Sequence, residues 1–208
     1  MNNQENRAGL TVAICAPSGS GKSYITQSVH ESFPGSFQEA VVATTRQERY
    51  GITELNRMFL TEDEFNDALE IEQIILPHRP FEYEGAPLYG FMSHILEFEK
   101  NIITEVHASI IDPFKKILSS KPTIILGLFA PDSELELNLM KRSGGTSDGV
   151  TVEQRMEHAV YEKQLIIEAA ELGYVDAIVP YFSEKRIETE AFILDAVAGF
   201  IKRNGHES

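Results

Sequence analysis

The most constraining feature of the chain is a short apolar run that leads into a glycine-rich turn and then into a helical pattern. Residues 10–16 read LTVAICA, and such near-continuous apolar character is typical of a strand that is covered on both faces of a sheet. Residues 23–33 follow with apolar side chains four apart, at Ile25 and Val29, which indicates a helix. The segment therefore predicts a strand–turn–helix unit, as found in parallel sheets that are flanked by helices.

The turn itself carries a phosphate-binding pattern. It reads APSGSGKS over residues 16–23 and departs from G-x-x-x-x-G-K-[ST] only by Ala16 at its first position. Glycines allow backbone N–H groups to converge on phosphate oxygens, and the helix that follows adds the positive end of its dipole. We expect Lys22 to reach the β- and γ-phosphates of ATP and the Ser23 hydroxyl to bind Mg²⁺. The predicted ATP-binding residues of the turn are Pro17, Ser18, Gly19, Ser20, Gly21, Lys22 and Ser23.

Further strands and helices alternate along the chain, so we predict an α/β P-loop NTPase fold with a mostly parallel sheet. The expected strands are 40–44, 102–107, 123–129 and 175–179, and the expected helices are a two-turn helix from the capping box at 61–64, 93–100, 132–141, 151–172 and 184–202. The stretch 73–91 contains three prolines and reads as irregular or edge-strand structure. We expect a single domain of 1–208, with a core at 10–44 and 93–203, an insertion at about 45–92 and a short glycine-rich lid at about 142–151.

The composition restricts the partners and the compartment. The chain has 208 residues, with 18 Lys and Arg against 32 Asp and Glu, for a net charge of −14. An acidic surface repels nucleic acid and anionic membranes, so we expect neither as a partner. The single cysteine, Cys15, excludes an internal disulfide, and the polar N-terminus lacks the apolar stretch of a signal peptide, so we expect a cytoplasmic protein. A second copy of the chain, in a homodimer, is a further candidate partner.

Five short motifs, in the same order along the chain, resemble those of the guanylate kinase family. They are the turn 16–23, Thr44–Arg49 (family T-T-R-x-x-R), Phe59 with Asp63–Phe65 (an aromatic strand and D-E-F), Leu88–Gly90 (Y-Y-G) and Gln154–Met156 (K-R-[LM]). The matches span roughly residues 10–180. This resemblance implies a nucleoside monophosphate kinase that uses ATP and Mg²⁺, with a core, a monophosphate-binding insertion and a mobile lid.

Arginines are informative in so acidic a chain, because an anionic substrate needs a local basic pocket. Arg46 and Arg49 lie three apart after a strand end, and guanidinium groups suit bidentate contact with a phosphate. We expect both to bind the monophosphate of a small phosphorylated acceptor, the alternative being a pair of surface ion pairs. The resemblance implies that the Tyr89 hydroxyl donates to the same phosphate; its alternative is core packing.

Two further arginines are assigned to ATP and to the phosphoryl group that it donates. The resemblance implies that Arg155 stabilises charge on the transferring phosphoryl group, so Lys22 and Arg155 are the predicted catalytic residues. The alternative for Arg155 is a solvated helix face. Arg142, which borders the expected lid, is a further ATP-binding candidate.

The resemblance fails at the positions that read guanine. Val42 stands where the family has a Ser hydroxyl, and Glu105-Val106-His107 stands where it has D-x-D. Glu105 and His107 are therefore predicted acceptor-binding residues. His107 has three interpretations: a reader of the acceptor's base, a partner that shares a proton with Glu105, or a packed histidine at a strand end.

Other departures lie in the insertion. The family's Glu after D-E-F is missing from residues 74–79, although Glu72, Glu82 or Glu84 could replace it. Arg57 stands where the family has a Tyr that contacts the acceptor phosphate. His78 is expected to face solvent, the alternative being that it faces the acceptor. The phosphate-holding features are thus largely kept and the guanine-reading ones largely lost. GMP is the family's default acceptor; the alternatives are another nucleotide or a sugar phosphate, a non-catalytic guanylate kinase-like binding module, or a P-loop NTPase switch.

Overall fold

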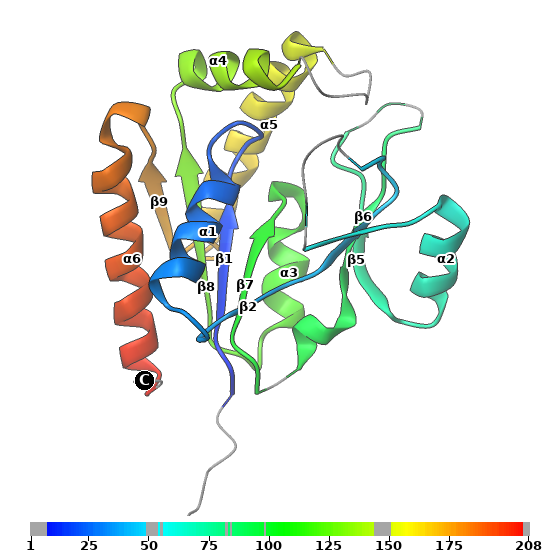
Figure 1. Cartoon of the computed structure of the whole chain (residues 1–208), viewed down its shortest axis with the longest axis horizontal. Coiled ribbons are helices and arrows are strands. Elements are labelled where there is room, and N and C mark those ends of the chain that lie inside the picture. Colours follow the sequence, from blue (N-terminus) through cyan, green and yellow to red (C-terminus); the bar gives the residue numbers. More distant parts are fainter. Residues whose placement is uncertain are drawn as a thin grey trace, which may run out of the picture.

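A computed structural model describes residues 8–48, 54, 56–81, 83, 85–97, 99–143 and 151–205 (Figure 1). Its larger sheet has five strands in the order β2-β7-β1-β8-β9, and every neighbouring pair is parallel. The strands are β1 (Thr11–Cys15), β2 (Gln38–Glu39), β7 (Ile102–Val106), β8 (Thr123–Phe129) and β9 (Ala177–Pro180). The predicted α/β class with a parallel sheet is confirmed.

Helices cover both faces of this sheet. Their bounds are α1 (Lys22–Ser32), α3 (Ile111–Ile117), α4 (Asp132–Ser143), α5 (Val152–Glu171) and α6 (Arg186–Arg203). Successive side chains of β1 point to opposite faces. Val12 and Ile14 pack with α1 and α6, whereas Ala13 and Cys15 pack with α3 and the second half of α5. All five residues of β1 are buried for this reason, which explains the unbroken apolar run in the sequence.

The insertion forms a second, four-stranded sheet beside the first (Figure 1). Its strand order is β4 (Arg57–Phe59), β3 (Val42–Thr44), β6 (Tyr89–Met92) and β5 (Ile74–His78), and only β3 and β4 run parallel. Helix α2 (Glu62–Glu70) begins at Thr61 with the predicted capping box and buries Phe65 against Ala43 and Ile74. The small sheet thus has an apolar centre of its own.

The strand expected at 40–44 is present as β3, and it pairs with β4 and β6 in the second sheet. One expectation for the insertion is wrong. The proline-rich stretch 73–91 ends in β6, which is an inner strand, although it was expected to be irregular or an edge. The prolines do not interrupt β6 because Pro77 lies in the edge strand β5, beside a register shift between Ile75 and His78.

The helix expected over 93–100 is also wrong. The structure has a single 3₁₀ turn, Ser93–Leu96, before β7. Directly after this turn, Lys121 Nζ donates to the Glu97 carbonyl at 3.0 Å.

Several predicted positions lie outside the described residues: Arg49, Glu82, Glu84 and residues 144–150 of the expected lid. Within the described ranges, no helix combines the length and the apolar sequence that crossing a bilayer requires.

Candidate active site

The glycine-rich turn leaves the start of α1 open to a ligand. Gly19 and Gly21 have φ angles of +89° and +84°, in the left-handed region that glycine adopts most readily. Gly21 is the N-cap of α1; no side chain caps the helix, and its first turn contains no acidic residue. The first N–H groups of a helix have no partner inside it, so this end can receive an anion.

The Lys22 ammonium group bonds to carbonyl oxygens of its own loop. Its Nζ donates to the carbonyl of Pro17 at 3.1 Å and also to that of Ala16. The next residue, Ser23, is exposed, and both residues line the same cavity. The motif therefore places a cation and a hydroxyl side by side at the start of α1.

A cavity of about 460 Å³ lies at the carboxyl ends of β1 and β7, between the loop, the second sheet and α5. The predicted site residues that line it are Ser18, Gly19, Gly21, Lys22, Ser23, Arg46, Tyr89, Glu105, His107 and Arg155. Pro17 and Ser20 belong to the loop but are buried. Arg142 lies in α4, and its side chain is outside the described part of the chain, as is Arg49. The structure thus brings together residues from distant parts of the sequence.

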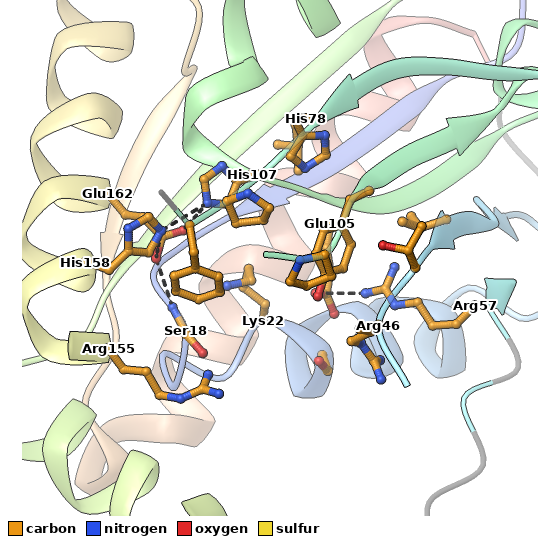
Figure 2. Close-up of a pocket in the computed structure, with 18 of the residues that line it drawn as sticks. Ser18, Lys22, Arg46, Arg57, His78, Glu105, His107, Arg155, His158 and Glu162 are labelled. Carbon is orange, nitrogen blue, oxygen red and sulfur yellow. Dashed lines mark hydrogen bonds and ion pairs between the residues drawn. The ribbon is translucent and has the colours of Figure 1, made fainter. Parts of the chain in front are cut away.

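Besides Arg155, two arginines beside the second sheet line this cavity, and each is paired with a carboxylate; Figure 2 shows the pair of Arg57 and Glu105. Arg46 Nη2 lies 2.6 Å from Glu54 Oε1, and its guanidinium carbon lies 5.0 Å from the centre of the Phe59 ring. Arg57 Nη2 lies 3.6 Å from Glu105 Oε2. The four paired side chains are between 11% and 17% exposed. An entering phosphate would meet two shielded guanidinium groups, which bind phosphate oxygens well.

Rings form a stacked column along another wall of the cavity. Tyr89 stacks on His78 with ring centres 5.9 Å apart, and His78 stacks on His107 at 5.6 Å. His107 and His158 lie edge to edge with nearly parallel ring planes, with ring centres 5.7 Å and Nε2 atoms 3.5 Å apart. Phe81 lies 4.6 Å from His158. Burial lowers the pKa of His78 to about 4, so its imidazole is neutral at pH 7. The expectation that His78 faces solvent is wrong, because its ring is enclosed by its neighbours in the column.

Glu162 of α5 connects this column to the loop. It is 3% exposed, its Oε1 lies 3.1 Å from His107 Nε2, and its Oε2 accepts a hydrogen bond from the Ser18 N–H at 3.3 Å. Burial disfavours the charged form of Glu162. The hydrogen bond from His107 and the charges of Lys22, His107 and His158 outweigh burial, so the pKa of Glu162 is lowered. Glu162 is therefore a buried anion at neutral pH, beside the phosphate loop.

Known proteins with similar sequences are guanylate kinases. The guanylate kinase of Streptococcus pneumoniae serotype 4 is 29% identical over 198 residues, which cover 92% of each chain. That of Chlamydia muridarum is 29% identical over 167 residues, 78% of this chain and 76% of the other. The chain is thus similar in sequence to guanylate kinases. No family model matches it. The fold agrees: a crystal structure of guanylate kinase from Anaplasma phagocytophilum superposes with a TM-score of 0.65 at 17% identity, covering 93% of this chain and 86% of that one.

This chain differs at the positions where the family resemblance leads us to expect guanine readers. Val42 is buried and lines the cavity with an apolar side chain. His107 bonds to Glu162, while Glu105 pairs with Arg57, so the interpretation of a proton shared between His107 and Glu105 is wrong. His107 is packed between two other rings and still borders the cavity.

Sequence reasoning missed two residues that line the cavity beside Arg155. His158 and Glu162 lie three and seven positions after Arg155, so all three project from one face of α5. Arg155 itself points its guanidinium carbon to within 6.0 Å of the centre of the Phe81 ring. The i, i+4 spacing of an imidazole and a carboxylate was the signal that could have revealed them.

Proposed function

We propose that the chain transfers the γ-phosphoryl group of Mg-ATP to the phosphate of a nucleoside monophosphate, with GMP as the family's default acceptor. The observation that carries this proposal is that the phosphate-loop lysine and two shielded arginines line one cavity. Phosphoryl transfer depends mainly on holding two phosphates in line and neutralising their charge. Lys22 would bind the phosphates of ATP, and Arg46 and Arg57 would bind the phosphate of the acceptor.

The donor side is the loop and the start of α1. Lys22 would exchange the carbonyls of Ala16 and Pro17 for phosphate oxygens, and the open N–H groups of α1 would bind the same oxygens. The Ser20 hydroxyl is buried without a hydrogen-bond partner among the described residues, as expected of a loop that is completed by a ligand. The Ser23 hydroxyl would hold Mg²⁺, which neutralises charge on the phosphates when it is bound.

The acceptor side is formed by the second sheet. Arg46 and Arg57 would exchange Glu54 and Glu105 for the acceptor's phosphate oxygens, and the Tyr89 hydroxyl would donate to the same group. An acceptor phosphate oxygen then bonds to the γ-phosphorus as the bond from that phosphorus to its bridging oxygen breaks. The products are ADP and a diphosphate of the acceptor.

Arg155 would stabilise the phosphoryl group during its transfer. It projects from α5 into the cavity, and a guanidinium group there would balance charge on the transferring phosphoryl group.

A second candidate is the same chemistry on another phosphorylated acceptor. Buried Val42 and packed His107 favour it, because they remove two polar readers of guanine and leave a wall of stacked rings. Another nucleotide or a sugar phosphate would then be the acceptor. A non-catalytic binding module is less well supported, since Lys22 and Ser23 are both present at the cavity.

The test is ADP formation from Mg-ATP with a panel of acceptors: GMP, dGMP, AMP, CMP, UMP, dTMP and ribose phosphates. We expect one acceptor to stimulate ADP formation strongly. GMP as that acceptor would support the default, and another member of the panel would support the second candidate. ADP formation that no acceptor stimulates would contradict both.

A further inference from the structure

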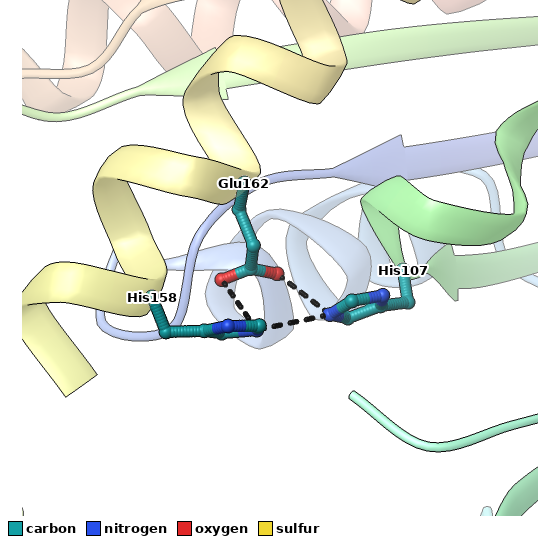
Figure 3. Close-up of side chains that lie close together, drawn as sticks. All are labelled: His107, His158 and Glu162. Carbon is teal, nitrogen blue, oxygen red and sulfur yellow. Dashed lines mark hydrogen bonds and ion pairs between the residues drawn. The ribbon is translucent and has the colours of Figure 1, made fainter. Parts of the chain in front are cut away.

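Three side chains of the cavity wall direct ligand atoms to one point (Figure 3). His107 Nε2 lies 3.1 Å from Glu162 Oε1, the two histidine Nε2 atoms lie 3.5 Å apart, and His158 Nε2 lies 4.0 Å from Glu162 Oε2. We propose that His107, His158 and Glu162 form a Zn²⁺ site that opens into the cavity. This site goes beyond the proposed phosphoryl transfer, which does not need it.

The spacing suits a small divalent ion. Zn²⁺ bonds nitrogen and oxygen ligands at about 2.0–2.1 Å, so tetrahedral ligands lie about 3.3 Å from one another. Two of the observed separations, 3.1 and 3.5 Å, lie on either side of this value. The third, 4.0 Å, joins His158 Nε2 to Oε2, the other oxygen of the carboxylate, so a rotation of His158 must bring its Nε2 closer to Oε1. One ligand atom from each of the three residues already lies within 4.8 Å of the other two. The His158 side chain is 15% exposed and borders the cavity, so it has room for that rotation.

The donor set selects the class of metal. Two imidazoles and one carboxylate are typical ligands of Zn²⁺, whereas Mg²⁺ and Ca²⁺ prefer oxygen ligands alone. Three protein ligands leave a fourth position of the tetrahedron free. Because all three side chains line the cavity, that position faces the cavity. A water molecule or a polar atom of a bound molecule would complete the site.

The ligands are held in place by their surroundings. His158 and Glu162 lie one turn apart on α5, and His107 follows β7 directly. The Nδ1 atom of His107 lies 2.8 Å from Ser109 Oγ. The same Nδ1 atom accepts a hydrogen bond from the Ser109 N–H at 3.3 Å. With Nε2 on the metal, the proton of the neutral ring would move to Nδ1, which would then donate to the Ser109 hydroxyl, a contact that commonly orients a histidine ligand. The Ser18 N–H orients the Glu162 carboxylate in the same way.

An ordinary ion pair between His107 and Glu162 explains only part of this arrangement. It does not require His158, yet His158 directs Nε2 toward His107 Nε2 and toward the same carboxylate. Two ring nitrogens that face one another require a proton or a metal ion between them, because two lone pairs repel. Glu162 is 3% exposed, and a buried carboxylate favours a cation as its partner.

The experiment is a Zn²⁺ titration of the full, tag-free chain after treatment with a chelator and without nucleotide. Competition with a chromogenic chelator gives the affinity, and Co²⁺ in place of Zn²⁺ gives a visible absorption spectrum that reports the number of ligands. We expect one tight Zn²⁺ per chain and the intense Co²⁺ bands of a four-coordinate complex. His158→Gln and Glu162→Gln should each weaken Zn²⁺ binding by about tenfold or more.

The matched control is His94→Gln, because His94 is partly buried but lies outside the cavity. This variant should bind Zn²⁺ as the parent does. Zn²⁺ binding that is weak in the parent, or that is equally tight in His158→Gln and His94→Gln, would overturn the proposal. Circular dichroism checks that the variants fold, and partly exposed His158 keeps the test valid even if Glu162→Gln does not fold. Since nucleotide is left out, a failure here leaves the proposed kinase activity untouched.

Discussion

A Cβ atom at Gly21 would lie 3.0 Å from the ring of Tyr181, the residue that directly follows β9. Tyr181 is buried, so its ring cannot turn away freely. Two constraints therefore favour glycine at position 21 of the phosphate loop: the backbone φ of +84° and the Tyr181 ring beside it.

Replacement of Gly21 should show both constraints. Gly35→Ala is the matched control, because Gly35 has a φ of +74° but nothing within 4 Å of an added Cβ. We expect Gly35→Ala to lower the free energy of unfolding by about 1–2 kcal/mol, from the backbone conformation alone. Gly21→Ala should lower it further and weaken ATP binding. Urea denaturation measures the free energy of unfolding of both variants. Equal losses in the two variants would show that the contact with Tyr181 does not affect stability.

Arg46→Lys should act on the acceptor and not on ATP. Lysine keeps the charge but loses the planar, bidentate geometry and the stacking on Phe59. A charge-assisted hydrogen bond is worth about 1.5–3 kcal/mol, so we expect KM for the acceptor to rise about tenfold or more. KM for ATP should stay the same. Steady-state kinetics test this, with exposed Arg203→Lys as the control; a parallel rise in both KM values would contradict the assignment.

Cys15 should be inert in the folded protein. It lies at the end of β1, is fully buried, and burial strongly raises the pKa of its thiol, so the reactive thiolate does not form. We predict that a thiol reagent such as DTNB reacts only as fast as the chain opens. Urea should accelerate the reaction, and ATP should slow it if binding stabilises the adjacent loop. Rapid reaction in native buffer would contradict the buried position.

The start of α2 should respond to acid. The pKa of Glu64 is lowered because its carboxylate accepts hydrogen bonds from the Thr61 backbone and hydroxyl in the capping box. A lowered pKa means that the stabilisation is present above the unfolded value, about 4.3, and is lost as the pH falls through the folded value. The difference in unfolding free energy between the parent and Glu64→Gln should therefore vanish in acid. A difference that is independent of pH would contradict this.

Local signals in the sequence were enough for the parallel sheet and the loop. The apolar run of β1, the glycines before Lys22 and the capping box at Thr61 each depend on neighbours in sequence. The inner position of strand β6 depends on a distant partner, β3, which no local pattern reveals.

The residues of the candidate site likewise fall into two groups: those that a local motif predicts and those that only the fold brings together. Lys22 and Ser23 belong to one contiguous motif, and Arg46 follows a recognisable strand end. The contact between Ser18 and Glu162 joins residues 144 positions apart, and His107 and His158 of the ring column are 51 positions apart. Only the tertiary packing of α5 creates these contacts. The carboxylate partners of Arg46 and Arg57 are likewise tertiary.

The most direct test follows the phosphoryl group itself. ATP labelled at its γ-phosphate is incubated with Mg²⁺ and the acceptor that the panel identifies, and the labelled products are separated. We predict that the label moves to the acceptor, which becomes a diphosphate, and that Lys22→Ala lowers this transfer by about 100-fold or more while exposed Lys116→Ala does not. Label that appears only as inorganic phosphate, at the same rate with and without the acceptor, would contradict the account.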